Sequence, residues 1–198
     1  MSDDLVDEIE YMIDLLTKSG FFSADEILEI LEDQFIEEDV DFSRFNISLN
    51  DSNNHNFERL EETFKKLAEK SIVAVHNCGY DFEEGVDDIF ELYVHLFNNK
   101  YQTQGFCFYT FEDVEEAIND EILKITFGDF QRSEEKSLEI GKIVYSQLVD
   151  SGFDVKWNES VNSQIEIRNF KWDKKYDNEK EYELEGAYEL FVGVKNES

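Results

Sequence analysis

Two side chains that could take part in catalysis, His76 and Cys78, stand directly after the apolar stretch at residues 72–75. Residues two apart on an extended chain share a face, so an imidazole and a thiol in this arrangement could act as base and nucleophile or contribute to a metal site. Open α/β sheets often bind ligands at this end of a strand. A nucleophilic thiol needs a positive environment, whereas the acidic run that begins at Asp81 predicts a raised thiol pKa. The competing interpretation is a buried structural cysteine.

A second group of side chains lies on the helix expected over residues 86–97. At about 100° per residue, Asp87, Asp88, Glu91 and His95 fall within one stripe about 100° wide. The candidate metal ligands are Asp88, Glu91 and His95, because the spacing of Glu91 and His95 places both on one helical face. Apolar residues cover the rest of the circumference, so the same pattern also predicts a mostly buried helix with one solvent-facing stripe.

The motifs of common enzymes are missing from the sequence. There is no GxxxxGK phosphate loop, GxGxxG dinucleotide motif, GxSxG nucleophile elbow or HExxH metal motif. Neighbouring carboxylates are frequent, but 48 acidic residues produce such pairs everywhere, so they do not indicate glycosidase chemistry. Cys107 alternates with two phenylalanines and is interpreted as a core residue. No cofactor is therefore predicted.

One segment near the end of the chain combines aromatic and basic residues. Its members are Trp157, Arg168, Phe170, Lys171, Trp172, Lys174, Lys175 and Tyr176. An aromatic patch among cations could stack on a nucleic-acid base. The favoured interpretation is that the rings pack the neighbouring hairpin against helices, while the lysines pair with nearby acids.

The charge is strongly negative along the whole chain. The formal net charge is −30, from 48 acidic and 18 basic residues, and no acidic tail accounts for it. Such a surface repels nucleic acid and anionic membranes and speeds encounter with basic partners. The alternative is that the acidity only keeps the protein soluble.

Two observations concern the compartment. The acidic start of the chain and the lack of an apolar run of about 18 residues predict neither a secretion signal nor a membrane span. Only two cysteines are present, which excludes a disulfide framework and is typical of a reducing compartment. A cytoplasmic location is expected.

Hydrophobic periodicity predicts an α+β (α/β-like) fold: a mixed β-sheet with packed helices, a helical hairpin at the amino terminus and a β-hairpin near the carboxyl terminus. Residues 1–50 are expected to form the helical hairpin and a loop, and residues 56–198 the α/β core domain. Within the irregular stretch 37–56, loose alternation of Val40, Phe42, Phe45, Ile47 and Leu49 suggests a short edge strand. The further expected elements are a helix over 57–67, strands over 72–75, 105–110 and 123–127, helices over 111–119 and 133–148, and paired strands over 153–157 and 164–170. The tail from Tyr176 fits helix or strand.

Several blocks of sequence resemble a bacterial domain family of unknown function. They are GFFSADEI from Gly20, IVAVHNCGY from Ile72, GFCFY from Gly105, FG at Phe127 and GFDVKW from Gly152. Their order spans nearly the whole chain, which implies one intact domain. Some relatives carry several cysteines where this chain has only Cys78, and this departure argues against a metal site. The resemblance implies no activity.

Two classes of function follow. The first is a non-catalytic interaction or inhibitor-type domain that binds a basic protein partner, such as a nuclease or toxin. The alternative is a small-ligand or metal-binding enzyme whose site lies near His76, Cys78 and His95. In a third arrangement, the amino-terminal helical hairpin is the docking module and the α/β part is its scaffold.

Overall fold

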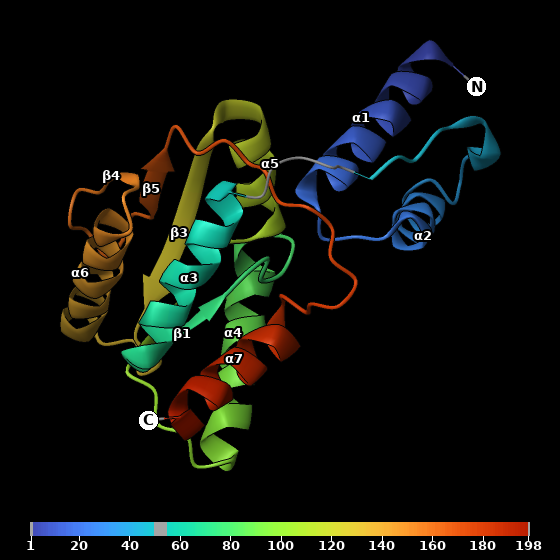
Figure 1. The fold of residues 1–198 in the computed structure, drawn as a ribbon. Helices are drawn as coiled ribbons and strands as arrows, with labels where there is room; N and C mark the ends of the chain where they lie inside the picture. Colours follow the sequence, from blue (N-terminus) through green and yellow to red (C-terminus); the bar gives the residue numbers. More distant parts are fainter. Residues whose placement is uncertain (1, 50–54, 198) are drawn as a thin grey trace.

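The computed structural model of the chain describes residues 2–49 and 55–197. Within these residues the chain forms seven α-helices, one 3-10 helix and five strands, which confirms the α+β class (Figure 1). The elements in order are α1 Asp3–Ser19, α2 Ala24–Gln34, the 3-10 helix Phe42–Arg44, α3 His55–Glu69, β1 Ile72–Val75, α4 Phe82–Asn98, β2 Gly105–Phe108, α5 Phe111–Asp120, β3 Ile122–Gly128, α6 Glu134–Asp150, β4 Asp154–Lys156, β5 Ile165–Arg168 and α7 Leu184–Glu197.

The five strands form one mixed sheet in the order β1-β2-β3-β5-β4. The β1 and β2 strands are parallel, with Ala74 opposite Cys107, and α4 provides the crossover that a parallel pair requires. All other pairs are antiparallel, and β4 and β5 form the predicted hairpin, with Val155 opposite Ile167. The hairpin does not end the chain, because a long connection and α7 follow it.

Both faces of β1 are buried because helices cover each side of the sheet at this edge. Ile72 and Ala74 belong to a cluster with residues of α3 and α6, whereas Val73 and Val75 belong to a second cluster with α4 and α7. The alternation follows from the two-residue period of a strand. A continuous apolar β1 is therefore the sequence signature of a strand enclosed on both faces.

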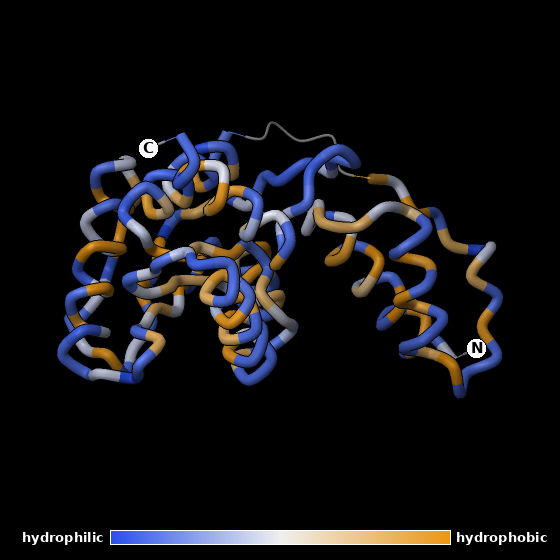
Figure 2. Tube along the Cα trace, turned by 90° about the horizontal axis from the view of Figure 1, so that it is seen from below, coloured by the Kyte–Doolittle hydropathy of each residue, from blue (hydrophilic) through white to orange (hydrophobic). Residues whose placement is uncertain are grey.

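The amino-terminal helices form the predicted hairpin. Ser23 caps α2 in a complete capping box, in which Glu26 N–H donates to the Ser23 side chain and the Glu26 carboxylate accepts from Ser23 N–H. The two helices enclose their own apolar cluster, which Phe111 of α5 joins. Figure 2 shows the hairpin as a separate lobe beside the α/β core.

The loop that follows the hairpin contradicts one prediction. No strand forms over residues 37–49; the chain makes a 3-10 helix there, and the apolar side chains expected to alternate in an edge strand instead pack onto the hairpin cluster. The last two residues of the predicted loop, His55 and Asn56, already belong to α3, whose first amides donate to the carboxylate of Asp173. The remainder of that prediction, residues 50–54, lies outside the described residues.

The prediction that α4 is mostly buried is also wrong. Only Gly85, Ile89, Leu92 and Leu96 are buried along its length. Apolar side chains beyond that face remain open, and Phe97 is 65% exposed. The reason is that α4 packs on the sheet and on α7 but is left uncovered elsewhere.

The tail from Tyr176, for which the sequence fitted either a helix or a strand, ends in the helix α7. No helix among the described residues is long and apolar enough to cross a membrane.

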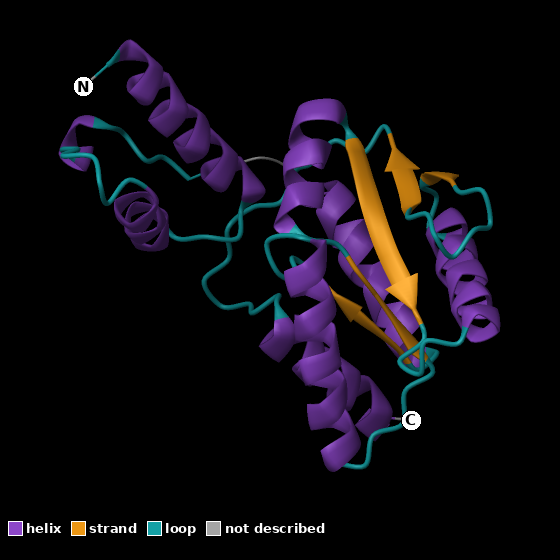
Figure 3. Ribbon diagram, turned by 180° about the vertical axis from the view of Figure 1, so that it is seen from behind, coloured by secondary structure: helices purple, strands orange, loops and turns teal. Residues whose placement is uncertain are grey.

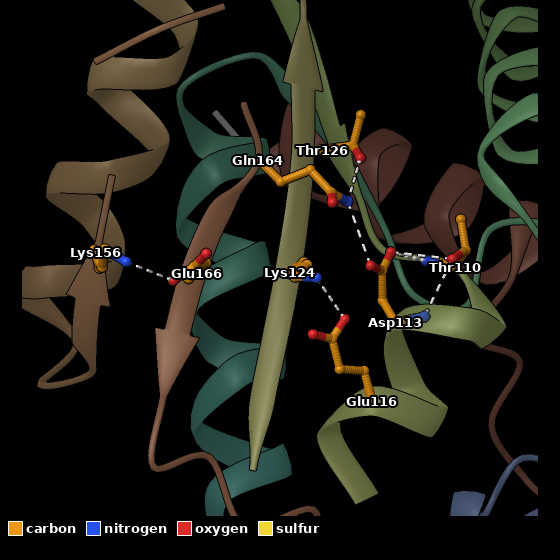
Figure 4. Close-up of polar contacts among 8 residues, drawn as sticks. All are labelled: Thr110, Asp113, Glu116, Lys124, Thr126, Lys156, Gln164 and Glu166. Carbon is orange, nitrogen blue, oxygen red and sulfur yellow. Dashed lines mark hydrogen bonds and ion pairs between the residues drawn. The ribbon is translucent and has the colours of Figure 1, made fainter. Parts of the chain in front are cut away.

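The apolar side chains of β3 and β5 pack against α3 and α6 on one face of the sheet. On the opposite face of these two strands, Figure 3 shows no covering helix. Polar side chains occupy it instead: Gln164 Nε2 donates to Thr126 Oγ1 at 3.0 Å and to Asp113 Oδ1 at 3.3 Å (Figure 4). The carboxylate of Asp113 also accepts from the backbone and hydroxyl of Thr110, the cap of α5. Two ion pairs complete the layer, Lys124–Glu116 at 2.7 Å and Lys156–Glu166 at 3.6 Å. These mutual contacts satisfy the polar groups of this face.

Candidate functional site

The turn after β1 brings its polar residues against the start of α4 and the end of β2. Gly79 has φ of 69°, and a Cβ atom there would lie 2.6 Å from the backbone nitrogen of Gly85. Glycine is therefore required by both backbone conformation and space. Asp81 caps α4 by accepting from two backbone amides, and the Cys78 N–H donates to the Tyr109 carbonyl. The turn is thus held rigidly between two elements.

His76 is enclosed by aromatic rings. It is 6% exposed, its ring stacks on Phe64 at 4.3 Å, and its Nδ1 is hydrogen-bonded to the Tyr109 hydroxyl at 2.9 Å. Burial, together with the positive charges of Lys174 and Lys180, lowers the pKa of His76 to about 3. The imidazole is therefore neutral at pH 7 and serves as a core residue.

Cys78 is a buried thiol rather than an activated one. It is 1% exposed, and its Sγ donates to the Gly85 carbonyl at 3.4 Å. Burial raises the pKa of Cys78, and the carboxylates of Asp88 and Glu183 add to the rise, in the direction expected from the acidic surroundings. Burial also raises the pKa of Cys107. Neither thiol has the properties of a nucleophile at neutral pH.

The burial of both thiols gives a direct prediction. In the native protein, neither Cys78 nor Cys107 should react with Ellman's reagent within minutes at pH 8, and both should react once the chain is unfolded in guanidinium chloride. A Glu139→Cys variant, which places a thiol on the exposed side of α6, is the positive control and should react at once. Reaction of a native thiol as fast as this control would contradict the assignment.

The three residues of the enzyme hypothesis do not meet in one place. Cys78 and Asp88 line a pocket beside the amino-terminal hairpin, Glu91 and His95 line a second pocket between α4 and α7, and His76 lines a third. The ring of His95 packs on Tyr188 at 4.8 Å. Among residues 2–49 and 55–197, no group of three or more His, Cys, Asp or Glu side chains is placed to hold a metal ion.

The pocket beside the hairpin, which we call the hairpin pocket, has a volume of about 610 Å³. One wall is apolar and comes from α1, α2 and the start of α5. The opposite wall is the turn after β1 together with the tail that leads into α7. The lining residues are Met12, Leu16, Phe22, Ile30, Gln34, Asn77, Cys78, Gly79, Tyr80, Asp88, Phe111, Glu181, Glu183, Leu184 and Glu185. The pocket therefore depends on three segments that are distant in sequence.

In the part of the chain that the structure describes, four carboxylates and no basic side chain line the hairpin pocket. The Oε1 atom of Glu183 accepts a hydrogen bond from Asn77 Nδ2 at 2.9 Å. Partial desolvation raises the pKa of Glu183 despite this hydrogen bond, and the charge of Asp88 contributes to the rise. Desolvation also raises the pKa of Asp88, with Glu84 as the next cause. The negative charge in this pocket is thus uncompensated by any cation that lines it.

Asn77 carries a buried acceptor that no donor contacts among the described residues. The residue is 5% exposed, and its Oδ1 atom is buried without a hydrogen-bond partner among the described residues. Because its Nδ2 donates to Glu183, the amide orientation is fixed and Oδ1 is the atom left over. A buried carbonyl oxygen without a donor costs about 1–3 kcal/mol.

A second pocket of about 750 Å³ adjoins the first, because Leu184 and Glu185 line both. Its floor includes Leu92 and Tyr188, and its rim carries Glu91 and Glu189 in addition. We call the two together the acidic groove; its carboxylates are Asp88, Glu91, Glu181, Glu183, Glu185 and Glu189. It runs over the first half of α7 beside α4, the two helices that lie together in Figure 1.

A comparison with protein-family models matches residues 2–176 to a domain of unknown function, DUF6891. The chain belongs to this family. No curated protein and no solved structure matches it. In this DUF6891 chain, α7 and the carboxylates from Glu181 onward lie beyond the matched residues, whereas Asn77 and Asp88 lie within them. The acidic groove therefore joins the family domain to the segment that follows it.

In the DUF6891 chain, one basic side chain of the aromatic and basic segment lies in an environment that the sequence did not predict. Lys174, expected to pair with an acid, is 1% exposed and places its Nζ over the rings of Tyr182 at 4.1 Å and Phe21 at 4.6 Å. It donates to the Gly20 carbonyl at the end of α1. Burial lowers the pKa of Lys174 to about 8. Arg168, for which no partner was predicted, forms an ion pair in which its Nη2 lies 3.4 Å from the Asp154 carboxylate.

The tryptophans of that segment pack in separate places. Trp157 contacts Phe127 of the sheet at 5.2 Å, whereas Trp172 contacts Phe57 at 5.8 Å and donates its indole N–H to the Ser19 carbonyl. The interpretation that the rings pack the hairpin and helices is confirmed.

Asn77 and Glu183 were not singled out from the sequence. Asn77 stands between the two candidates His76 and Cys78, so the sequence indicated its place in a turn. Its hydrogen bond with Glu183, which lies 106 residues further along the chain, could not be foreseen from that pattern. Glu183 belongs to the tail whose structure the sequence left open. Only a correct placement of that tail would have identified the pair.

Proposed function

We propose that this protein is a non-catalytic binding domain that recognises a basic protein partner through the acidic groove. One observation carries the proposal: two adjoining pockets with apolar floors are rimmed by six carboxylates, and no lysine or arginine of residues 2–49 and 55–197 lines either of them. A basic, partly apolar surface of a partner is the complement of such a groove.

The physical basis is electrostatic attraction combined with apolar contact. A net charge of −30 draws cationic partners toward the whole surface and raises the association rate. The groove adds selectivity, because its carboxylates stand at fixed positions that favour a partner with matching cations. Val94, Leu184 and Tyr188 offer apolar area to bury. The free thiols of Cys78 and Cys107 support a cytoplasmic setting for this binding.

The test uses a fluorescently labelled amphipathic helical peptide with lysines on one face, and the same peptide with those lysines replaced by glutamates. The lysine peptide should bind, the glutamate peptide should not, and binding should weaken as salt rises from 50 to 300 mM. In the variant Glu185→Lys/Glu189→Lys, which reverses two charges of the groove, affinity should fall by about tenfold or more.

The matched control is Glu135→Lys/Glu139→Lys, which makes the same charge change at the same spacing on the exposed face of α6. This control should lose much less affinity than the groove variant. Equal losses in the two variants would show that only the global charge matters, and no binding of the lysine peptide at 50 mM salt would overturn the proposed function.

A further inference from the structure

Two parallel lines of apolar residues run along α4. The first line, Gly85, Ile89, Leu92 and Leu96, is buried and faces the sheet. The second line begins one residue later and keeps the same spacing of four, three and four residues: Val86, Phe90, Tyr93 and Phe97. We call this second line the α4 seam. A shift of one residue turns the seam by about 100° around the helix, so it faces away from the core that the first line enters.

The seam is closed in its middle and open at its ends. Phe90 and Tyr93 pack their rings on Phe130, at 5.6 and 4.2 Å. Phe97 at the far end is 65% exposed, and Phe82, one turn before the seam begins, is 58% exposed. A helix that is apolar over this much of its circumference is typical of one enclosed by other elements. Exposed rings along such a helix therefore indicate a contact surface.

The sheet face beside the seam carries no helix. Phe130 directly follows β3, so the seam faces the strands beyond β2. The register places Thr126 opposite Phe108, which packs on α4, and Lys124 shares the face of Thr126. The polar face of β3 and β5 thus continues the face on which α4 lies, and none of the described helices covers it (Figure 3). The helical layer made by α7 and α4 ends at the seam.

The opposite flank of α4 shows what kind of element packs beside this helix. There α7 lies alongside, and its Tyr188 packs on the ring of His95 at 4.8 Å. The residues of α7 lie beyond those matched to the family domain. A helix from outside the family domain therefore already covers one flank of α4.

The solvent side of the seam is acidic. Glu83 and Asp87 lie one further step around the helix, and both are exposed. A second copy of this chain carries the same net charge of −30 and the same carboxylates beside its own seam, so two copies repel each other. Lysine or arginine residues beside the apolar stripe of a different protein are attracted instead.

We infer that the α4 seam binds an amphipathic helix of a partner protein, with the apolar stripe of that helix against the seam and its basic residues toward Glu83 and Asp87. The bound helix lies about 8–10 Å from α4, over the uncovered face of β3 and β5. Phe82 and Phe97 are the rings that it buries. The inference goes beyond the proposed function, because the seam and the acidic groove lie on different flanks of α4.

The experiment uses a fluorescently labelled helical peptide with leucines spaced four, three and four residues apart and lysines along one side of that stripe. This peptide should bind the full chain saturably. Replacement of its leucines by glutamines should abolish binding, and replacement of its lysines by glutamates should weaken binding about tenfold or more. A glutamine peptide that binds as tightly as the leucine peptide would overturn the inference, because negative charge alone would then explain the binding.

Matched variants locate the binding on α4. The change Phe82→Ser/Phe97→Ser removes both exposed rings and should raise the dissociation constant of the leucine peptide about tenfold or more. The control Ile36→Ser/Val149→Ser removes two exposed apolar side chains elsewhere and should change it less than twofold. Equal effects of the two variants would show that the peptide does not bind at the seam.

A charge reversal gives a second test, which decides the matter if Phe82→Ser/Phe97→Ser does not fold. Asp87→Lys should weaken the lysine peptide and strengthen the glutamate peptide, because it reverses a charge beside the seam. Glu139→Lys, at an exposed position of α6, should do neither. The same response in both variants would contradict the assignment.

Two further outcomes separate this site from its rivals. Sedimentation equilibrium of the full chain should show a monomer; a dimer that Phe82→Ser/Phe97→Ser dissociates would mean that a second copy covers the seam. If only Glu185→Lys/Glu189→Lys weakens the leucine peptide, the acidic groove stands and the inference is wrong. If only Phe82→Ser/Phe97→Ser weakens it, the seam binds the helix and the groove does not.

Discussion

Acid should destabilise the folded protein through His76 by about 3 kcal/mol between pH 6.5 and pH 4, and by more as the pH approaches 3. The pKa of this imidazole is about 3 in the folded protein, against 6.5 for an exposed histidine. Between these values the unfolded chain binds a proton that the folded chain does not bind. The contribution of His76 is thus fully present above pH 6.5 and is lost as the pH falls through 3.

The cause is the closed surroundings of the ring. It is surrounded by the rings of Phe57, Phe64, Tyr109 and Tyr182, and no carboxylate of the described residues is hydrogen-bonded to it. Protonation would place a desolvated cation beside a lysine whose charge already lowers the histidine pKa. The folded state therefore resists protonation until it unfolds.

The measurement is urea unfolding of the wild type and His76→Phe at several pH values from 7 to 3.5. The free energy of unfolding of the wild type minus that of His76→Phe should decrease by about 3 kcal/mol between pH 6.5 and pH 4. Use of a difference is necessary because Asp113 and Glu183, with raised pKa values, act in the opposite direction in both proteins. His95→Gln, at an exposed histidine, should follow the wild type. Parallel curves for wild type and His76→Phe would show that the imidazole is hydrated.

Lys174 should give the second large effect, at alkaline pH. Its pKa is about 8 in the folded protein and near 10.5 when exposed, so the unfolded chain binds more protons between these values. Stability contributed by this group therefore rises with pH from 8 to 10.5, by about 3 kcal/mol in total, and is lost as the pH falls through 8.

The test compares the wild type with Lys174→Met, which keeps an unbranched side chain in the ring cluster. The free energy of unfolding of the wild type minus that of the variant should increase by about 3 kcal/mol between pH 8 and 10.5. Lys171→Met, at an exposed lysine of the same segment, should show no such increase. Ionisation of Cys78 and Cys107 in the unfolded chain destabilises all three proteins alike above pH 9 and cancels in the difference. A constant difference would mean that Lys174 is solvated.

Lys174 also explains how the hairpin is joined to the core. Together with Trp172 it supplies two donors to the last carbonyl groups of α1, Ser19 and Gly20, where the helix dipole favours a positive group. The Tyr182 ring beside it belongs to the tail that forms one wall of the hairpin pocket. The same segment thus ties the amino-terminal lobe to the residues that form the acidic groove.

Local sequence was sufficient wherever a short pattern determines a short structure. Ser23 with Glu26 predicted a helix start, and the structure has both hydrogen bonds of that box. The continuous apolar run at 72–75 became a strand buried on both faces, and the alternating stretches near 155 and 167 became a hairpin. These elements depend on backbone preferences and periodicity within a few residues.

Predictions failed where the outcome depended on a partner element. Apolar residues around α4 predicted a mostly buried helix with one polar stripe, but Phe97 is exposed because none of the described elements covers that side. The residues from Val40 to Leu49 alternated like a strand, yet they pack on the hairpin because no strand is available for pairing. His76, Cys78 and His95 looked like one site on the linear sequence, and the fold sends them into three pockets.

Among the described elements, the sequence by itself determined six of the seven α-helices, the five strands, the mixed sheet and the strongly negative charge, because periodicity, caps and charge are properties of neighbouring residues or of composition. Only the tertiary structure decided that Asn77 and Glu183 meet, that Lys174 is enclosed by rings, and that one groove collects six carboxylates. Such features require segments up to 154 residues apart to come together, and their energies arise from burial and desolvation that a local pattern does not contain.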